Sequence, residues 1–149
     1  NKRLDSLQSA LQLSTDTSGF EVGWAVVNLT PEEVGPLAGY GARKPKEWTA
    51  IHDSAFVRTL VLRQGSRQVA VVTADLLVIH PELSRRVWEQ LPAGWSKSQI
   101  YFTATHTHSG PGGWAPGLVG KLFSGPYDPQ IVDWLATQII TSIHEAQAN

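Results

Sequence analysis

Two histidines that stand two positions apart are the strongest chemical signal in the sequence. His106 and His108 lie in the stretch T-A-T-H-T-H-S-G-P-G-G, residues 103–113, of a chain with 5 histidines in all. In an extended chain, residues i and i+2 point to the same side, so their Cβ atoms would lie about 6–7 Å apart. Neutral imidazole is a common zinc ligand, and a catalytic zinc needs about three protein ligands and an open position for water. The pair could share a metal, or one histidine could bind metal while the other acts on a substrate.

The residues after the histidines predict a loop that contacts a ligand. Ser109, Gly110, Gly112 and Gly113 surround Pro111, which stiffens the turn. Glycines let the backbone approach a ligand closely and aim N–H groups at a developing oxyanion. We therefore expect these four residues to form a substrate or oxyanion loop. The alternative is a tight turn beside two histidines that are exposed or satisfied in the core.

Two further side chains are candidates for supporting roles. Asp75 follows the apolar run 68–74 and could orient His106 through a hydrogen bond to its ring. The alternatives for Asp75 are a helix cap, a turn residue or an ion pair with Arg58. His52 precedes a predicted strand, and it either lines the same cleft or is an ordinary loop histidine.

Composition narrows the class of protein. A chain of 149 residues with 42% hydrophobic residues is long enough for one domain with its own core. The absence of cysteine excludes a disulfide framework, a thiolate metal site and a cysteine nucleophile. A formal net charge of -1 and the lack of a long basic run argue against a nucleic-acid partner.

The spacing of apolar residues predicts the elements that would position the histidines. They are, in order, a helix over 2–13, a linker ending at 19, a strand over 20–29, a long loop over 30–49, a hairpin of strands 55–63 and 68–74 around the turn 64–67, a helix over 81–91, a strand over 99–103 and a helix over 128–148. We divide the chain into residues 1–19, an N-terminal helix and linker, and residues 20–149, a single folded unit.

This order predicts an α/β fold built on a mixed β-sheet. The hairpin makes two strands antiparallel, and the strand–helix–strand crossover makes the strands at 68–74 and 99–104 parallel. Helices are expected to pack on the sheet. Since ligands gather at the carboxyl ends of parallel strands, Asp75 and the two histidines should be near neighbours in space.

The histidine loop also resembles the signature of a known family. T-H-T-H-S-G-P-G-G is similar to the motif of the neutral (non-lysosomal) ceramidases. Other segments follow in that family's order, and the resemblance runs from Phe20 to the final helix. These segments are V-G-W-A at 22–25, G-Y at 39–40, I-H-D at 51–53, A-F-V-R at 55–58 and V-T-A-D at 72–75.

The resemblance implies a function and a cofactor. Members of the family hydrolyse the amide bond of ceramide with a zinc-bound water. Carried over by motif, His106 would be a zinc ligand and His108 a catalytic residue beside the reacting amide. The substrate would be ceramide or a related lipid amide.

The resemblance also implies that the chain is the N-terminal portion of a longer catalytic domain. The family's remaining ligands are a histidine, a glutamate and a tyrosine from later in the polypeptide, so a downstream part or another chain would complete the site. A secreted, periplasmic or membrane-associated location and contact with a membrane surface are further implications. The alternative function is a non-catalytic binding or structural domain that keeps the histidine loop without a complete metal site.

Overall fold

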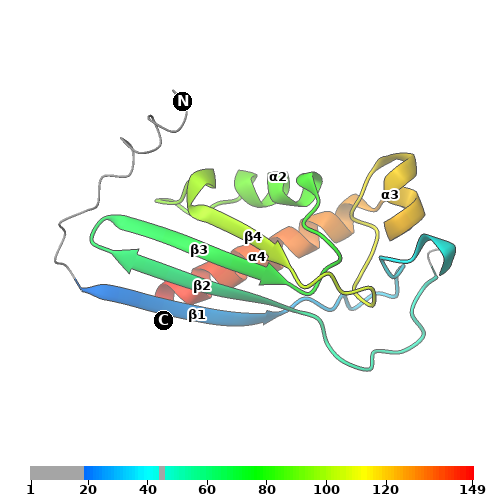
Figure 1. The fold of residues 1–149 in the computed structure, drawn as a ribbon, viewed down its shortest axis with the longest axis horizontal. Helices are drawn as coiled ribbons and strands as arrows, with labels where there is room; N and C mark the ends of the chain where they lie inside the picture. The colour runs from blue at the N-terminus through cyan, green and yellow to red at the C-terminus, as the bar shows by residue number, and fades with distance from the viewer. Residues whose placement is uncertain (1–18, 44–45) are drawn as a thin grey trace, which may run out of the picture.

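A computed structural model describes residues 19–43 and 46–149 of the chain. The predicted helix over residues 2–13, and the linker up to residue 18, lie outside the described residues. The elements are β1 (Phe20–Asn28), the short 3-10 turn η1 (Gly41–Arg43), β2 (Phe56–Gln64), β3 (Arg67–Ala74), α2 (Pro81–Glu89), the 3-10 turn η2 (Lys97–Gln99), β4 (Ile100–Ala104), α3 (Gly117–Ser124) and α4 (Pro129–Ala148) (Figure 1).

The strands form a mixed sheet in the order β1-β2-β3-β4, which confirms the predicted fold class. β1 and β2 pair antiparallel, as do β2 and β3, whereas β3 and β4 pair parallel through the α2 crossover. A tight turn at Gly65 and Ser66 joins β2 to β3, and Gly65 adopts the left-handed φ of 55° that such turns require.

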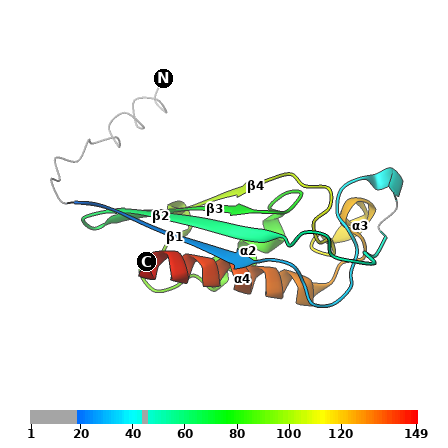
Figure 2. The ribbon, with the colours of Figure 1, turned by 90° about the horizontal axis from the view of Figure 1, so that it is seen from below.

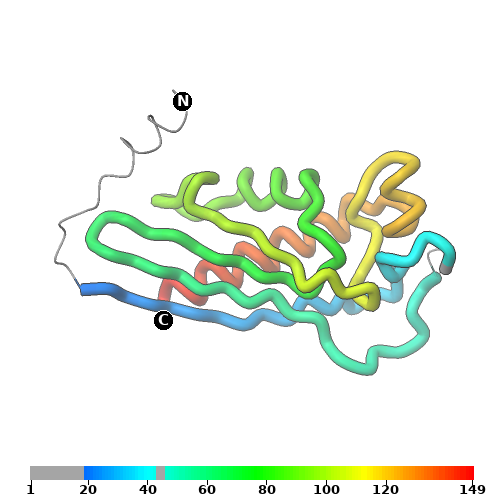
Figure 3. Tube along the Cα trace, viewed as in Figure 1, coloured from blue at the N-terminus to red at the C-terminus, as the bar shows by residue number. Residues whose placement is uncertain are grey.

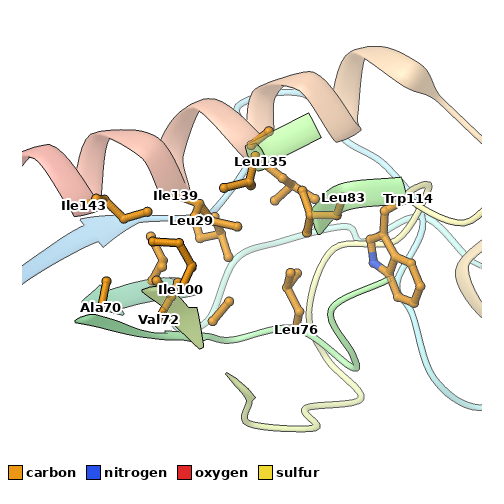
Figure 4. Close-up of a cluster of buried hydrophobic side chains, with 14 of the residues drawn as sticks. Leu29, Ala70, Val72, Leu76, Leu83, Ile100, Trp114, Leu135, Ile139 and Ile143 are labelled. Carbon is orange, nitrogen blue, oxygen red and sulfur yellow. The ribbon is translucent and has the colours of Figure 1, made fainter. Parts of the chain in front are cut away.

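Helices α2 and α4 cover one face of the sheet (Figure 2). As the helical spacing predicts, Leu135, Ile139 and Ile143 of α4 point into the core, where they meet the inward residues of the strands (Figure 4). α4 also lies very close to β1, because a Cβ on Gly23 would fall 1.9 Å from the Ala146 carbonyl oxygen. This close approach explains a glycine in the middle of an edge strand.

The opposite face of the sheet is apolar and open. Trp24, Leu60 and Tyr101 are 63%, 38% and 60% exposed and lie in one row across the strands, in register with Val71. Val22 and Val26 extend the row along β1. Within residues 19–43 and 46–149, no helix lies over this face (Figure 2).

The chain between β4 and α4 departs from the prediction. It was expected to be a loop, but it contains the helix α3, which its two glycines, Gly117 and Gly120, concealed in the sequence. The loop over 30–49 is irregular, as predicted, and two isolated bridges fasten it, Pro36 to Glu47 and Leu37 to Pro111. No helix in the described part of the chain is both long and apolar enough to span a bilayer.

Candidate functional site

The histidine loop begins where β3 and β4 end side by side. Ala74 and Ala104 are the last paired residues of these parallel strands, and the N–H of Thr105 donates to the Ala74 carbonyl at 3.0 Å. The chain then leaves the sheet at its carboxyl edge and runs through the loop to α3 (Figure 3). The predicted placement of His106 and His108 at this edge is therefore confirmed.

The backbone turns sharply at His106. This residue has a φ of 60°, and among the described residues it is the one non-glycine residue with positive φ. Such a conformation costs free energy for a residue with a Cβ, although histidine adopts it more readily than most residues, and it is enriched at functional sites. The extended conformation expected for residues 106–108 is therefore wrong, because the left-handed turn directs the His106 ring toward the segment after β3.

A backbone carbonyl holds the His106 ring. The Nδ1 atom lies 2.8 Å from the carbonyl oxygen of Leu77. Because a carbonyl oxygen only accepts, this bond places the proton on Nδ1 and leaves the lone pair on Nε2. The side chain is exposed, so Nε2 is accessible to a ligand. Metal-binding histidines are oriented in this way, by a hydrogen bond from the nitrogen that does not bind the metal.

His108 packs between His106 and the loop before β2. The two imidazole centroids are 5.2 Å apart and their planes meet at 74°. On its other side the His108 ring lies 4.3 Å from the ring of Tyr40. Gly39 allows this contact, since a Cβ there would fall 2.7 Å from Nδ1 of His108. In the sequence, Gly39 and Tyr40 were noted only because they match the family pattern. Without that pattern, the one signal for them is a glycine followed by an aromatic residue in a long loop, since long loops in compact domains are often functional.

The glycines after the histidines pack backbone against backbone. The N–H of Gly112 donates to the Pro36 carbonyl at 2.6 Å, and that of Gly113 donates to the Ser124 carbonyl. These two amides donate within the fold in this structure, and a contact of Gly112 and Gly113 with substrate stays a prediction. A Cβ on Gly112 would fall 2.2 Å from the Ser124 oxygen, which gives the physical reason for glycine there.

Ser109 and Gly110, at the start of the loop, make different contacts from Gly112 and Gly113. Ser109 is exposed, and its N–H donates to the Thr107 hydroxyl at 3.2 Å. Gly110 is buried, and its carbonyl accepts from Ala38. Trp114 is buried and donates from Nε1 to the Pro111 carbonyl at 2.7 Å, so it packs inside the protein.

Asp75 accepts its hydrogen bonds from residues of the sheet. Its Oδ2 accepts from the Phe56 N–H at 2.9 Å and from Arg58 at 3.0 Å. The predicted pairing with Arg58 is confirmed. The ring of His106 donates to the Leu77 carbonyl and not to the Asp75 carboxylate, and residue types do not reveal such a backbone partner.

Two hollows flank the loop. One, of about 320 Å³, is lined by Ser109, Pro111 and the apolar side chains of Leu37, Trp48 and Ile51, with the exposed His52 at its rim. The other is more open and is lined by His106 together with residues of α2 and β4, including Trp88 and Phe102. His52 and His106 thus line different hollows on the two sides of the loop.

The described residues fit part of a zinc site. His106 carries the correct ring nitrogen for one ligand, and His108 lies beside it. Within residues 19–43 and 46–149, however, no group of three or more histidine, cysteine, aspartate or glutamate side chains could hold a metal ion. Because zinc needs about three protein ligands, this part of the chain does not form a complete site by itself.

Comparison with known proteins adds an independent line of evidence. Residues 20–149 match the family model described as neutral/alkaline non-lysosomal ceramidase, N-terminal. Among curated proteins, the neutral ceramidase of Pseudomonas aeruginosa is 28% identical over 135 residues, which cover 87% of this chain and 20% of that protein. The neutral ceramidase of Mycobacterium tuberculosis is 26% identical over 137 residues, which cover 86% of this chain and 21% of that protein.

Solved structures agree with these matches. A crystal structure of the Pseudomonas aeruginosa neutral ceramidase superposes with a TM-score of 0.78 at 26% identity, over 90% of this chain and 22% of that one. A structure described as ceramidase complexed with C2 gives 0.76 at 27% identity, over 87% of this chain and 21% of that one. The chain thus spans about a fifth of the length of the relatives it matches.

Proposed function

The chain belongs to the neutral/alkaline non-lysosomal ceramidase family, and from that premise we propose that it carries the histidine half of a zinc-dependent amide hydrolase site. The substrate is ceramide or a related lipid amide, cleaved at its N-acyl bond. One observation carries the proposal for this chain's own residues. The Leu77 carbonyl orients His106 so that Nε2 points away from its hydrogen-bonding partner in a strained, exposed turn.

Each residue of the histidine loop has its own role in the proposed reaction. His106 binds zinc through Nε2, and the Leu77 carbonyl keeps that nitrogen free of a proton. When bound, zinc activates water at neutral pH and polarises the amide carbonyl. His108, held between His106 and Tyr40, contacts the reacting amide and donates or accepts a proton there. Ser109, which is exposed at the start of the loop, contacts the substrate.

The remaining ligands come from outside the described residues. This part of the proposal is supported by the incomplete ligand set and by the length of the relatives, of which the chain spans about a fifth. A downstream part of the polypeptide or another chain supplies them. A secreted, periplasmic or membrane-associated location stays a prediction from the family.

Zinc titration tests the proposal directly. We expect the purified chain to bind zinc weakly, and His106→Ala to weaken binding by at least about tenfold, since removing a ligand or its support costs this much. The matched control is His52→Ala, because His52 is exposed and lines the other hollow. Equal affinity in the wild type and His106→Ala would sink the assignment of His106, as would an equal loss in His52→Ala.

The alternative is a non-catalytic domain that retains the loop. The incomplete ligand set favours this alternative as much as it favours a shared site. Amide hydrolysis separates the two when the assay uses the chain together with the polypeptide that completes it. Hydrolysis that falls in His106→Ala and in His108→Ala supports the enzyme, and unchanged hydrolysis in both variants supports the alternative.

A further inference from the structure

The chain leaves β3 by a tight turn centred on Asp75. The N–H of Leu76 donates to the Ala74 carbonyl at 2.8 Å, which closes a three-residue turn of the kind found at strand ends. The same Ala74 carbonyl accepts at 3.0 Å from Thr105, the residue that follows β4. The turn at the end of β3 is therefore joined directly to the segment that carries His106.

The Asp75 side chain takes the place of its own carbonyl in the ladder between β2 and β3. Asp75 stands opposite Phe56, one position beyond the last pair of the ladder, and its N–H donates to the Phe56 carbonyl at 2.8 Å. In an antiparallel sheet, a pair of this kind exchanges two main-chain bonds. Here the return bond from the Phe56 N–H goes to Oδ2 of Asp75, at 2.9 Å. The carboxylate thus completes the ladder and releases the Asp75 carbonyl from it.

The released carbonyl lies against the histidine loop. A Cβ on Gly110 would fall 2.8 Å from the Asp75 carbonyl oxygen, so a glycine at position 110 is what permits this approach. Gly110 is buried, and its own carbonyl accepts from the N–H of Ala38 at 3.1 Å. The loop is therefore fitted to the Asp75 peptide in the orientation that the turn gives it.

Two residues after Asp75, the same segment presents the carbonyl that holds His106. The Leu77 oxygen lies 2.8 Å from Nδ1 of the His106 ring. The side chains of Leu76 and Leu77 are buried, and Leu76 lies among the core side chains (Figure 4). Their burial fixes where the segment lies, whereas the turn at Asp75 fixes how its peptide planes are rotated. The direction of the Leu77 carbonyl therefore depends on the bonds that Asp75 makes.

We propose that Asp75 is a positioning residue for His106 and acts on it through the Leu77 carbonyl. Oδ2 replaces the main-chain carbonyl in the ladder, the freed peptide turns toward the loop, and the Leu77 carbonyl then receives the Nδ1 proton of His106. The inference rests on the proposed function for its consequence, because there His106 is a zinc ligand. Removing a group that orients a metal-binding histidine typically lowers metal affinity about 10- to 100-fold.

The acceptor oxygen of Asp75, and not its charge, carries this role. Arg58 contacts the same Oδ2 at 3.0 Å, but the Arg58 side chain is 48% exposed, against 21% for Asp75. An ion pair with a partner so open to solvent contributes little. An asparagine at position 75 keeps an acceptor oxygen for the Phe56 N–H, whereas an alanine offers none. These two substitutions therefore separate the hydrogen bond from the charge.

The tautomer of His106 is a readout that a merely structural role would not move. Long-range ¹H–¹⁵N correlation spectra of the zinc-free full chain, at mildly alkaline pH, should show the Nδ1–H form in the wild type, in Asp75→Asn and in Arg58→Gln. In Asp75→Ala the share of this form should fall, and zinc affinity should drop by at least about tenfold. The matched control is Ser142→Ala, which removes a buried hydrogen bond between β2 and α4 and should leave the tautomer unchanged.

Three results would overturn the proposal. The first is an unchanged tautomer in a folded Asp75→Ala, and the second is an equal change in Ser142→Ala. The third is an equal change in Asp75→Asn, which would transfer the role to the ion pair with Arg58. Near-UV circular dichroism shows whether each variant is folded.

A second variant decides the question if Asp75→Ala does not fold. In Gly110→Ala the new Cβ displaces the Asp75 carbonyl from the side of the loop, so the share of the Nδ1–H form should fall there as well. An unchanged tautomer in this variant would contradict the proposal. Because the tautomer is measured without metal, failure of the positioning role and failure of the zinc assignment, which His106→Ala tests, appear in separate experiments.

Discussion

The imidazole of His108 lies so close to Gly39 that a Cβ on residue 39 would fall 2.7 Å from its Nδ1. Gly39 also has a φ of 123°, a conformation that residues with a Cβ rarely adopt. The position of a proposed catalytic ring thus depends on the absence of a side chain nearly seventy residues earlier in the chain. The loop over residues 36–43 is part of the site for this reason, although its own side chains bind no zinc in our proposal.

Gly39→Ala should lower the free energy of unfolding and displace the His108 ring. The matched control is Gly94→Ala, because Gly94 has a φ of 88° and a Cβ there would have no neighbour within 4 Å. The control should lose about 1–2 kcal/mol from backbone strain alone. Urea unfolding should show a larger loss for Gly39→Ala, and the His108 ring signals should shift in its NMR spectrum. Equal losses and unshifted His108 signals would show that the contact is unimportant.

The neutral imidazole of His106 should carry its proton on Nδ1. The reason is that the Leu77 carbonyl, 2.8 Å away, can only accept a hydrogen bond. Long-range ¹H–¹⁵N correlation spectra at mildly alkaline pH distinguish the two tautomers. His52 is the internal control, and because its Nε2 lies 3.8 Å from a carboxylate oxygen of Asp53, its proton should be mainly on Nε2. A proton found on Nε2 of His106 would contradict the orientation on which the zinc proposal depends.

The buried hydroxyl pair between β2 and α4 should show strong coupling. Thr59 Oγ1 and Ser142 Oγ are 2.6 Å apart, and Ser142 also donates to the Ile139 carbonyl, so Thr59 is the donor within the pair. Ser142→Ala should cost about 1–3 kcal/mol, because it leaves the Thr59 hydroxyl buried without its acceptor. Thr59→Val removes that hydroxyl, so the double variant should lose less than the sum of the single losses. Additive losses in urea unfolding would contradict this account.

Glu82 should stabilise the fold in a pH-dependent way. Its hydrogen bonds to Arg85 and then Arg86 hold the pKa of the Glu82 carboxyl below its ordinary value of 4.5, although partial burial opposes the shift. Arg86 also reaches Asp133 of α4 at 2.6 Å, so the cluster links α2 to α4. A lowered pKa in the folded state means that the stabilisation is present above about pH 4.5 and is lost as the pH falls through the folded value.

The test compares the wild type with Glu82→Gln at several pH values. At pH 7 the wild type should be the more stable protein in urea unfolding. The difference between the two should shrink as the pH falls below 4.5 and through the lowered pKa of folded Glu82, because both side chains are neutral once the pH lies below that pKa. A difference that stays constant with pH would show that the charge of Glu82 has no part in it.

Much of the sheet and its helices could be predicted from the sequence. The hairpin, the α2 crossover and α4 have strong periodic patterns, and Gly65 marks the turn between β2 and β3. The parallel pairing of β3 and β4 follows from the handedness of the crossover. That pairing is also what places the histidine loop at the carboxyl edge of the sheet. For these elements the spacing of apolar residues in the sequence agrees with the way the strands and helices pack in the fold.

The shape of the site was decided by tertiary structure. The Leu77 carbonyl, and not the Asp75 side chain, holds His106, and the amides of Gly112 and Gly113 are used by Pro36 and Ser124. Backbone carbonyls are the same at every residue, so no residue type marks which one accepts a given bond. The exposed apolar side chains of α3 were hidden for a related reason. The sequence predicts a loop there, and only the contact of Gly120 with Ala115 fixes which side of the helix faces the protein.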